Sequence, residues 1–79
     1  MFINKGPDGR NNICGVRIAQ LRSEKGISQR MLADQLQLLG QDLDKNAIQR
    51  IEAGKRFITD IELLVFAQFF AVSVAELYG

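Results

Sequence analysis

The stretch that decides the fold is "DLDKNAIQRIEAGKRF" at residues 42–57. Asp44 is suited to begin a helix, because its side-chain oxygen can accept a hydrogen bond from a backbone N–H of the first turn. Gly54 is suited to follow the end of that helix, because glycine adopts the left-handed conformation that often closes a helix. We therefore predict a short helix over about residues 44–53.

One side of this helix carries only amides and cations. Four such side chains fall within an arc of roughly 140° at about 100° per residue. Ala47, Ile48 and Ile51 occupy the other side, so the helix has a narrow apolar back and a broad polar front. Amide and cationic donors match base edges and phosphates of DNA. The alternative is an ordinary solvated helix face. The side chains concerned are Lys45, Asn46, Gln49 and Arg50.

Composition excludes several classes of protein. A chain of 79 residues with 47% hydrophobic residues indicates one small folded domain. With no histidine, one cysteine and no phosphate-binding glycine loop, we expect neither an enzyme nor a metal or other cofactor. The lone Cys14 indicates a reducing compartment. The sequence shows neither a transmembrane segment nor a signal peptide, so we expect a cytoplasmic protein.

Charge is unevenly distributed along the chain. Residues 1–30 carry six cations and two anions, and residues 44–56 carry four cations and two anions. Residues 57–79 carry three anions and no cation. This division is expected when one end of a domain meets a polyanion and the other packs against protein.

Periodicity and capping residues predict five helices and an all-α fold. The helices are expected over about residues 13–25, from Ser28 to about residue 40, over 44–53, from Thr59, and from Ser73. Thr59 with Glu62, and Ser73 with Glu76, have the spacing of a capping box. The side chains expected in the core are Cys14, Ile18, Leu21, Leu32, Ala33, Leu36, Phe66, Phe69 and Phe70.

Two segments resemble a known family. "RIAQLRSEKGISQRMLADQL" at residues 17–36 and "AIQRIEAGKR" at residues 47–56 are similar to the helix-turn-helix domain of the phage repressor/Cro type, often called the XRE family. The resemblance extends over about residues 13–78 and includes "VSVAELYG" at the C-terminal end. It implies a compact five-helix domain that regulates transcription by binding specific sequences of double-stranded DNA.

The resemblance also implies roles for individual residues. The third helix would lie in the major groove. Arg22 and Glu52 would form a salt bridge between the first and third helices. Lys55 and Arg56 would otherwise interact with the helix dipole alone. The implied base contacts are Lys45, Asn46, Gln49 and Arg50, and the implied phosphate contacts are Ser28, Gln29, Lys55 and Arg56.

The connection before the third helix departs from the family pattern. The family usually has a glycine four residues after the alanine of "LA", whereas this chain has Gln37. The link is about five residues longer than usual. We expect Gly40 to end the second helix late, and Leu39 and Leu43 to pack the extended link. Gln41 could add contacts to DNA.

The remaining expectations concern the two ends of the chain. Residues 1–12 are expected to form a flexible arm, in which Lys5 and Arg10 are candidates to reach DNA, and residues 13–79 to form the domain. Specificity usually requires two copies on a palindromic site. A weak homodimer on a palindromic operator is therefore expected. The alternative function is a protein-interaction module, antitoxin-like or adaptor, that uses the same polar helix face. The candidate dimer surface consists of Val72, Val74, Leu77 and Tyr78.

Overall fold

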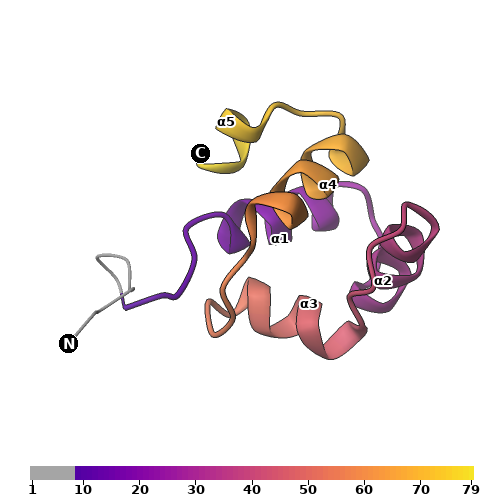
Figure 1. Ribbon diagram of the computed structural model, residues 1–79, viewed down its shortest axis with the longest axis horizontal. Coiled ribbons are helices and arrows are strands. Elements are labelled where there is room, and N and C mark those ends of the chain that lie inside the picture. Colours follow the sequence, from indigo (N-terminus) through magenta and orange to yellow (C-terminus); the bar gives the residue numbers. More distant parts are fainter. Residues whose placement is uncertain (1–8) are drawn as a thin grey trace.

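The computed structural model describes residues 9–79, and over this range it consists of five α-helices (Figure 1). This confirms the all-α prediction and the order of the predicted helices. The starts predicted from Ser28, Asp44, Thr59 and Ser73 are also confirmed, because each of these residues is an N-cap. The helices are α1 (Gly15–Glu24), α2 (Gln29–Leu38), α3 (Lys45–Glu52), α4 (Asp60–Phe70) and α5 (Val74–Leu77).

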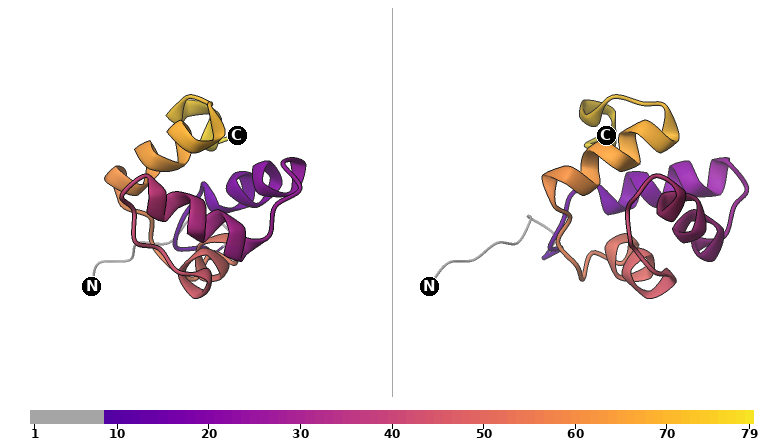
Figure 2. Two further views of the ribbon diagram at one scale, coloured as in Figure 1. Left: turned by 90° about the vertical axis from the view of Figure 1, so that its right-hand side faces the viewer. Right: turned by 45° about the vertical axis from the view of Figure 1, so that its right-hand side comes forward.

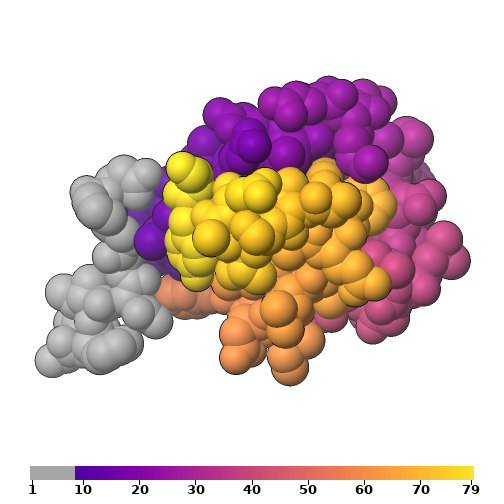
Figure 3. Space-filling model, turned by 90° about the horizontal axis from the view of Figure 1, so that it is seen from above, coloured from indigo at the N-terminus to yellow at the C-terminus, as the bar shows by residue number. Residues whose placement is uncertain are grey.

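The helix α3 packs against the two helices that precede it in the chain. Both α1 and α2 pack against α3, and α4 reaches back to α2. The short α5 packs on α4 (Figure 2). In Figure 3, which shows the molecule from above, α4 and α5 lie beside each other, and α1 lies next to them. The exposed side of α3 is thus left at the end of the molecule away from α5 (Figure 1).

The core draws fully buried side chains from every helix. The predicted core residues of α1 and α2 are confirmed, as are Phe66 and Phe70 of α4. Phe69 is half-buried and meets the edge of Phe70, with ring centroids 4.9 Å apart. Leu77 is 0% exposed, so its expected place on a dimer surface is wrong. Leu77 is the buried side chain of α5, a single-turn helix that needs this contact to stay in place. The largest fully buried side chains are Phe66, Ile18, Leu32, Leu36, Ile48, Ile51 and Leu77.

The long link between α2 and α3 begins at a left-handed glycine. Gly40 has φ +86°, its N–H donates to Gln37 O, and the N–H of Gln41 donates to Leu36 O, both at 3.0 Å. This arrangement ends α2 as predicted. Leu43 is 5% exposed and belongs to the core, which is also as predicted. Leu39 is 42% exposed, so its predicted packing is wrong: the chain reverses at Gly40, and Leu43 reaches the core instead.

Candidate nucleic-acid interface

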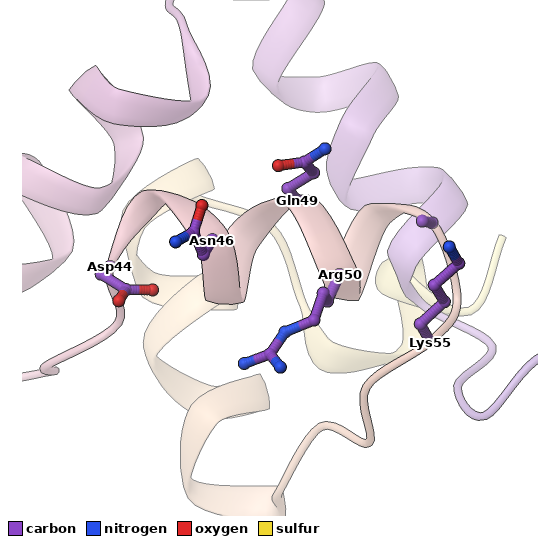
Figure 4. A pocket seen from close by; sticks show the side chains of 6 residues that line it. Asp44, Asn46, Gln49, Arg50 and Lys55 are labelled. Atoms are coloured by element: carbon purple, nitrogen blue, oxygen red, sulfur yellow. The ribbon is translucent and has the colours of Figure 1, made fainter.

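The outer face of α3 presents three of the predicted base-contacting side chains together. Asn46, Gln49 and Arg50 are all exposed and line one shallow depression, which Lys55 extends beyond the helix end (Figure 4). In Figure 4, Gln49 and Arg50 project toward opposite edges of this face. The face is open because Ala47, Ile48 and Ile51 turn the other side of α3 into the core. The depression thus presents amide and cationic donors, and the carboxylate of Asp44 lines it as well.

Lys45 lies at a different place. It lines a second depression, between α2 and α3, together with carboxylates of the link and of α2. Asp44, which stands between the two depressions, accepts from Ala47 N at 2.7 Å and so caps α3. The exposed Arg30 of α2 shares the second depression with Lys45. Sequence reasoning missed Arg30, although its position two residues after the helix cap Ser28 could have indicated it.

The start of α2 is the second part of the candidate interface. The hydroxyl of Ser28 accepts from Met31 N at 3.1 Å, which confirms Ser28 as the cap of α2. The first backbone amides of a helix have no acceptor within the helix, and such amides are suited to bind a phosphate. Gln29 is half-buried, and its Nε2 donates to Glu52 Oε1 at 3.0 Å. This side chain therefore braces α3, and the second N–H of its amide can donate to another group.

Glu52 connects three helices. Arg22 of α1 donates to the Glu52 carboxylate through Nε at 2.7 Å and through Nη2 at 3.0 Å, and the third donor is Gln29 of α2. The predicted ion pair between Arg22 and Glu52 is confirmed. A further bond from Arg22 Nη1 to Ile27 O, at 2.9 Å, ties the turn between α1 and α2 to the same network. The orientation of α3 against its neighbours is thus fixed by polar as well as apolar contacts.

The two cations after α3 have different surroundings. Lys55 is exposed, whereas Arg56 is half-buried and faces Glu62 of α4. The guanidinium of Arg56 donates to both carboxylate oxygens of Glu62, at 2.9 and 3.0 Å, and to Phe57 O at 2.9 Å. Glu62 is 6% exposed. Burial alone would raise the pKa of Glu62, but hydrogen bonds from Arg56 and Thr59 lower it overall.

The segment before α1 also reaches α3, which sequence reasoning did not predict. Arg10, Asn11 and Asn12 donate to backbone carbonyls at the end of α3 and just beyond it. These three residues belong to the arm expected over residues 1–12. Residues 1–8 of that arm, which include Lys5, lie outside the described residues. The sequence separations of about 40 residues left no local signal for these contacts.

Comparison with known proteins agrees with this geometry. A family model described as helix-turn-helix matches residues 18–77, which includes α2, α3, α4 and α5 in full. The chain belongs to this helix-turn-helix family, of the XRE type. The helix-turn-helix itself is formed by α2 and α3, and the protein is a DNA-binding transcription regulator.

A solved structure extends the comparison. The crystal structure of the restriction-modification controller protein C.AhdI from Aeromonas hydrophila superimposes on this helix-turn-helix protein with a TM-score of 0.68 and 30% sequence identity. The match covers 81% of this chain and 86% of that chain. A search of curated proteins finds no match. Among residues 9–79, no helix combines the length and apolarity that crossing a membrane requires.

Proposed function

We propose that α3 enters the major groove of double-stranded DNA and reads base edges through its exposed face. The observation that carries this proposal is the shared depression of Asn46, Gln49 and Arg50 with Lys55 at its end. An α-helix with its side chains is about 10–12 Å across, which matches the width of the major groove. Lys45, at the first turn of α3, would contact a base at the groove edge.

Phosphate contacts would flank this helix on both sides. Ser28 caps α2 and Gln29 is its first residue, and Lys55 follows α3 with an exposed side chain. Arg56 was expected to contact phosphate as well. Because its guanidinium already holds Glu62, we propose that Arg56 meets a phosphate only through the donors that face away from Glu62. Lys55 is then the main cation at this end.

The protein would act as a homodimer on a palindromic operator in the cytoplasm. Leu77 lies in the core, and Val72 and Val74 are half-buried against it, so Tyr78 alone of the expected dimer surface is well exposed. The large apolar side chains that α4 leaves exposed are Ile61 and Leu64, at 65% and 63%, beside 53% for Tyr78. One such domain contacts too few base pairs for useful specificity, so we expect two copies on the operator. We propose Ile61, Leu64 and Tyr78 as the dimer surface, because they are large apolar side chains exposed to solvent. In sedimentation with operator DNA, the wild type should bind as two copies, whereas Leu64→Glu should bind as one. A wild type that stays monomeric on DNA would refute the dimer.

The proposal is tested by binding to duplex DNA across a salt series. Each phosphate contact that is lost lowers the slope of log affinity against log salt by about 0.9. Lys55→Ala should show this change. Arg17→Ala removes the same charge from α1, where Arg17 Nη1 donates to Gln20, and should leave the slope unchanged. Equal slope changes in both variants, or binding that does not depend on salt, would contradict phosphate contacts at Lys55.

Base contacts are tested after an operator has been selected. Gln49→Ala should lower discrimination between the operator and random DNA by about 5- to 150-fold, which corresponds to about 1–3 kcal/mol. Gln68→Ala is the matched control, because Gln68 is an exposed amide on α4. Unchanged discrimination in Gln49→Ala, Asn46→Ala and Arg50→Ala together would refute base recognition by this face and favour a protein partner for it.

A further inference from the structure

Three consecutive residues before α1 run along the C-terminal end of α3. Arg10 Nη2 donates to Glu52 O at 2.7 Å, and the backbone N–H of Asn11 donates to Gly54 O at 2.8 Å. The side chain of Asn11 donates to Lys55 O at 3.1 Å. The Nδ2 group of Asn12 donates to Ile51 O at 3.0 Å and to Arg56 O at 2.7 Å. We refer to residues 10–12 as the N-terminal clamp.

The clamp satisfies groups that a helix end leaves without partners. The last carbonyls of an α-helix have no donor within the helix, and they carry the negative end of its dipole. Arg10 brings a positive charge and a donor to Glu52 O at this end of α3. Beyond the helix, Asn11 and Asn12 hold the carbonyls of Lys55 and Arg56. These hydrogen bonds therefore fix the backbone at Lys55 and at Arg56, the two cations that follow α3.

Two glycines permit this close approach. A Cβ on Gly15, at the start of α1, would collide with the backbone oxygen of Ile51 and lie 2.6 Å from Asn12 Oδ1. A Cβ on Gly54 would lie 2.7 Å from the guanidinium carbon of Arg10, and Gly54 also has φ +79°. The Oδ1 atom of Asn12 accepts from Gly15 N at 2.8 Å, which joins the clamp to α1. The fit is thus specific to this pairing of segments.

We propose that the N-terminal clamp positions Lys55 for contact with a DNA phosphate. The inference rests on the proposed function. Lys55 is an exposed, flexible side chain, and ordering it on DNA costs conformational entropy. A fixed backbone lowers that cost, because only the side chain must then be ordered. Asn11 is the key positioning residue, because its uncharged side-chain amide donates to the backbone carbonyl of Lys55 itself.

The test uses the salt slope of DNA binding together with a double-mutant cycle. Asn11→Ala removes one exposed hydrogen bond and leaves the backbone bond from Asn11 N to Gly54 O in place. We expect this uncharged substitution to shift the salt slope toward that of Lys55→Ala. We also expect Lys55→Ala to weaken binding by about 10-fold in the wild-type background and by about 3-fold or less in the Asn11→Ala background. Gln68→Ala is the matched amide control and should leave slope and coupling unchanged.

A second variant protects the test against loss of the fold. Asn12→Asp keeps an oxygen that can accept from Gly15 N, but it replaces the amide donor to Ile51 O and Arg56 O with an acceptor. Helix content and thermal stability of each variant are measured beside its binding. Asn12→Asp should also lower the salt slope at a temperature where it is fully folded. A role of the clamp in stability alone would change the melting temperature and leave the slope of Asn11→Ala, which changes no charge, intact.

The outcomes separate the clamp from the proposed function. Wild-type binding that depends on salt and on Lys55, with effects of Asn11→Ala and Lys55→Ala that simply add, would overturn the clamp and leave the proposed function standing. A wild type whose binding does not depend on salt or on Lys55 would overturn both. A slope that falls in Asn11→Ala and Asn12→Asp, but not in Gln68→Ala, would support the clamp.

Discussion

Substitution of Glu52 by glutamine tests how the interface is held in place. Three N–H groups, two from Arg22 and one from Gln29, point at the Glu52 carboxylate. An amide of the same size has one acceptor oxygen, and its NH₂ group would face a donor. The side chains of Arg22 and Glu52 are only 19% and 9% exposed, so the guanidinium would lose its counter-ion in a partly buried position. Hydrogen bonds to charged groups contribute about 1.5–3 kcal/mol and broken buried pairs cost about 3–5 kcal/mol, so we expect Glu52→Gln to lower the free energy of unfolding by about 3 kcal/mol.

Thermal and urea denaturation followed by circular dichroism measure this change. For a domain of this size, about 3 kcal/mol corresponds to a fall in Tm of about 12–24 °C. Glu76→Gln is the control, because Glu76 is an exposed carboxylate on α5, and its effect should stay within about 0.5 kcal/mol. The double variant Arg22→Met with Glu52→Leu should recover much of the loss, since it leaves no buried charge. A loss below about 1 kcal/mol in Glu52→Gln would refute the argument that this network fixes α3.

Three further predictions concern stability. Because the pKa of Glu62 is lowered in the folded protein, the unfolded chain binds the proton first as pH falls. The free energy of unfolding of the wild type should therefore decrease from about pH 5 downward. In urea denaturation from about pH 3 to 7, the midpoint of Glu62→Gln should depend less on pH than that of the wild type. Gly15→Ala should cost about 2–3 kcal/mol in urea denaturation, because the added methyl meets Ile51 O, and a change within about 0.5 kcal/mol would contradict this packing. Ala71 ends α4 with φ +57°, so Ala71→Gly should raise stability by about 0.5–1 kcal/mol; a lower Tm would show that the left-handed conformation is not strained.

Local signals in the sequence were sufficient for the helices. Capping residues have fixed relations to the first turn of a helix, so Ser28, Asp44, Thr59 and Ser73 were found from residue type and spacing alone. The buried face of α3 followed from helical periodicity for the same reason. Leu39 and Leu77 were placed wrongly because their burial depends on how the chain turns after a helix. That direction is set by tertiary packing and not by the spacing of apolar residues.

The candidate site was only partly accessible to the same reasoning. The exposed face of α3 is a property of one helix, so three of its four predicted side chains were found together in one depression. The partners of Arg56 and of the N-terminal clamp lie on other segments. A pattern of residue types shows that Arg56 is a cation, but not that Glu62 will meet it. The long-range pair of Arg22 and Glu52 was predicted only because the family resemblance supplied it.

The shortness of α3 explains why so many polar contacts gather around it. An isolated helix of eight residues is not stable in water, so the side chains that we propose to face DNA depend on neighbours for their position. Ile48 and Ile51 hold the middle of the back of α3, and Glu52 fixes its angle to α1 and α2. The N-terminal clamp and the bond from Arg56 to Glu62 fix the chain after it. Substitutions at residues outside the proposed DNA contacts should therefore also weaken binding. They can be distinguished from direct phosphate contacts, because losses in Glu52→Gln and Gly15→Ala should follow the loss of stability and lessen at lower temperature, whereas Lys55→Ala should weaken binding in a fully folded protein.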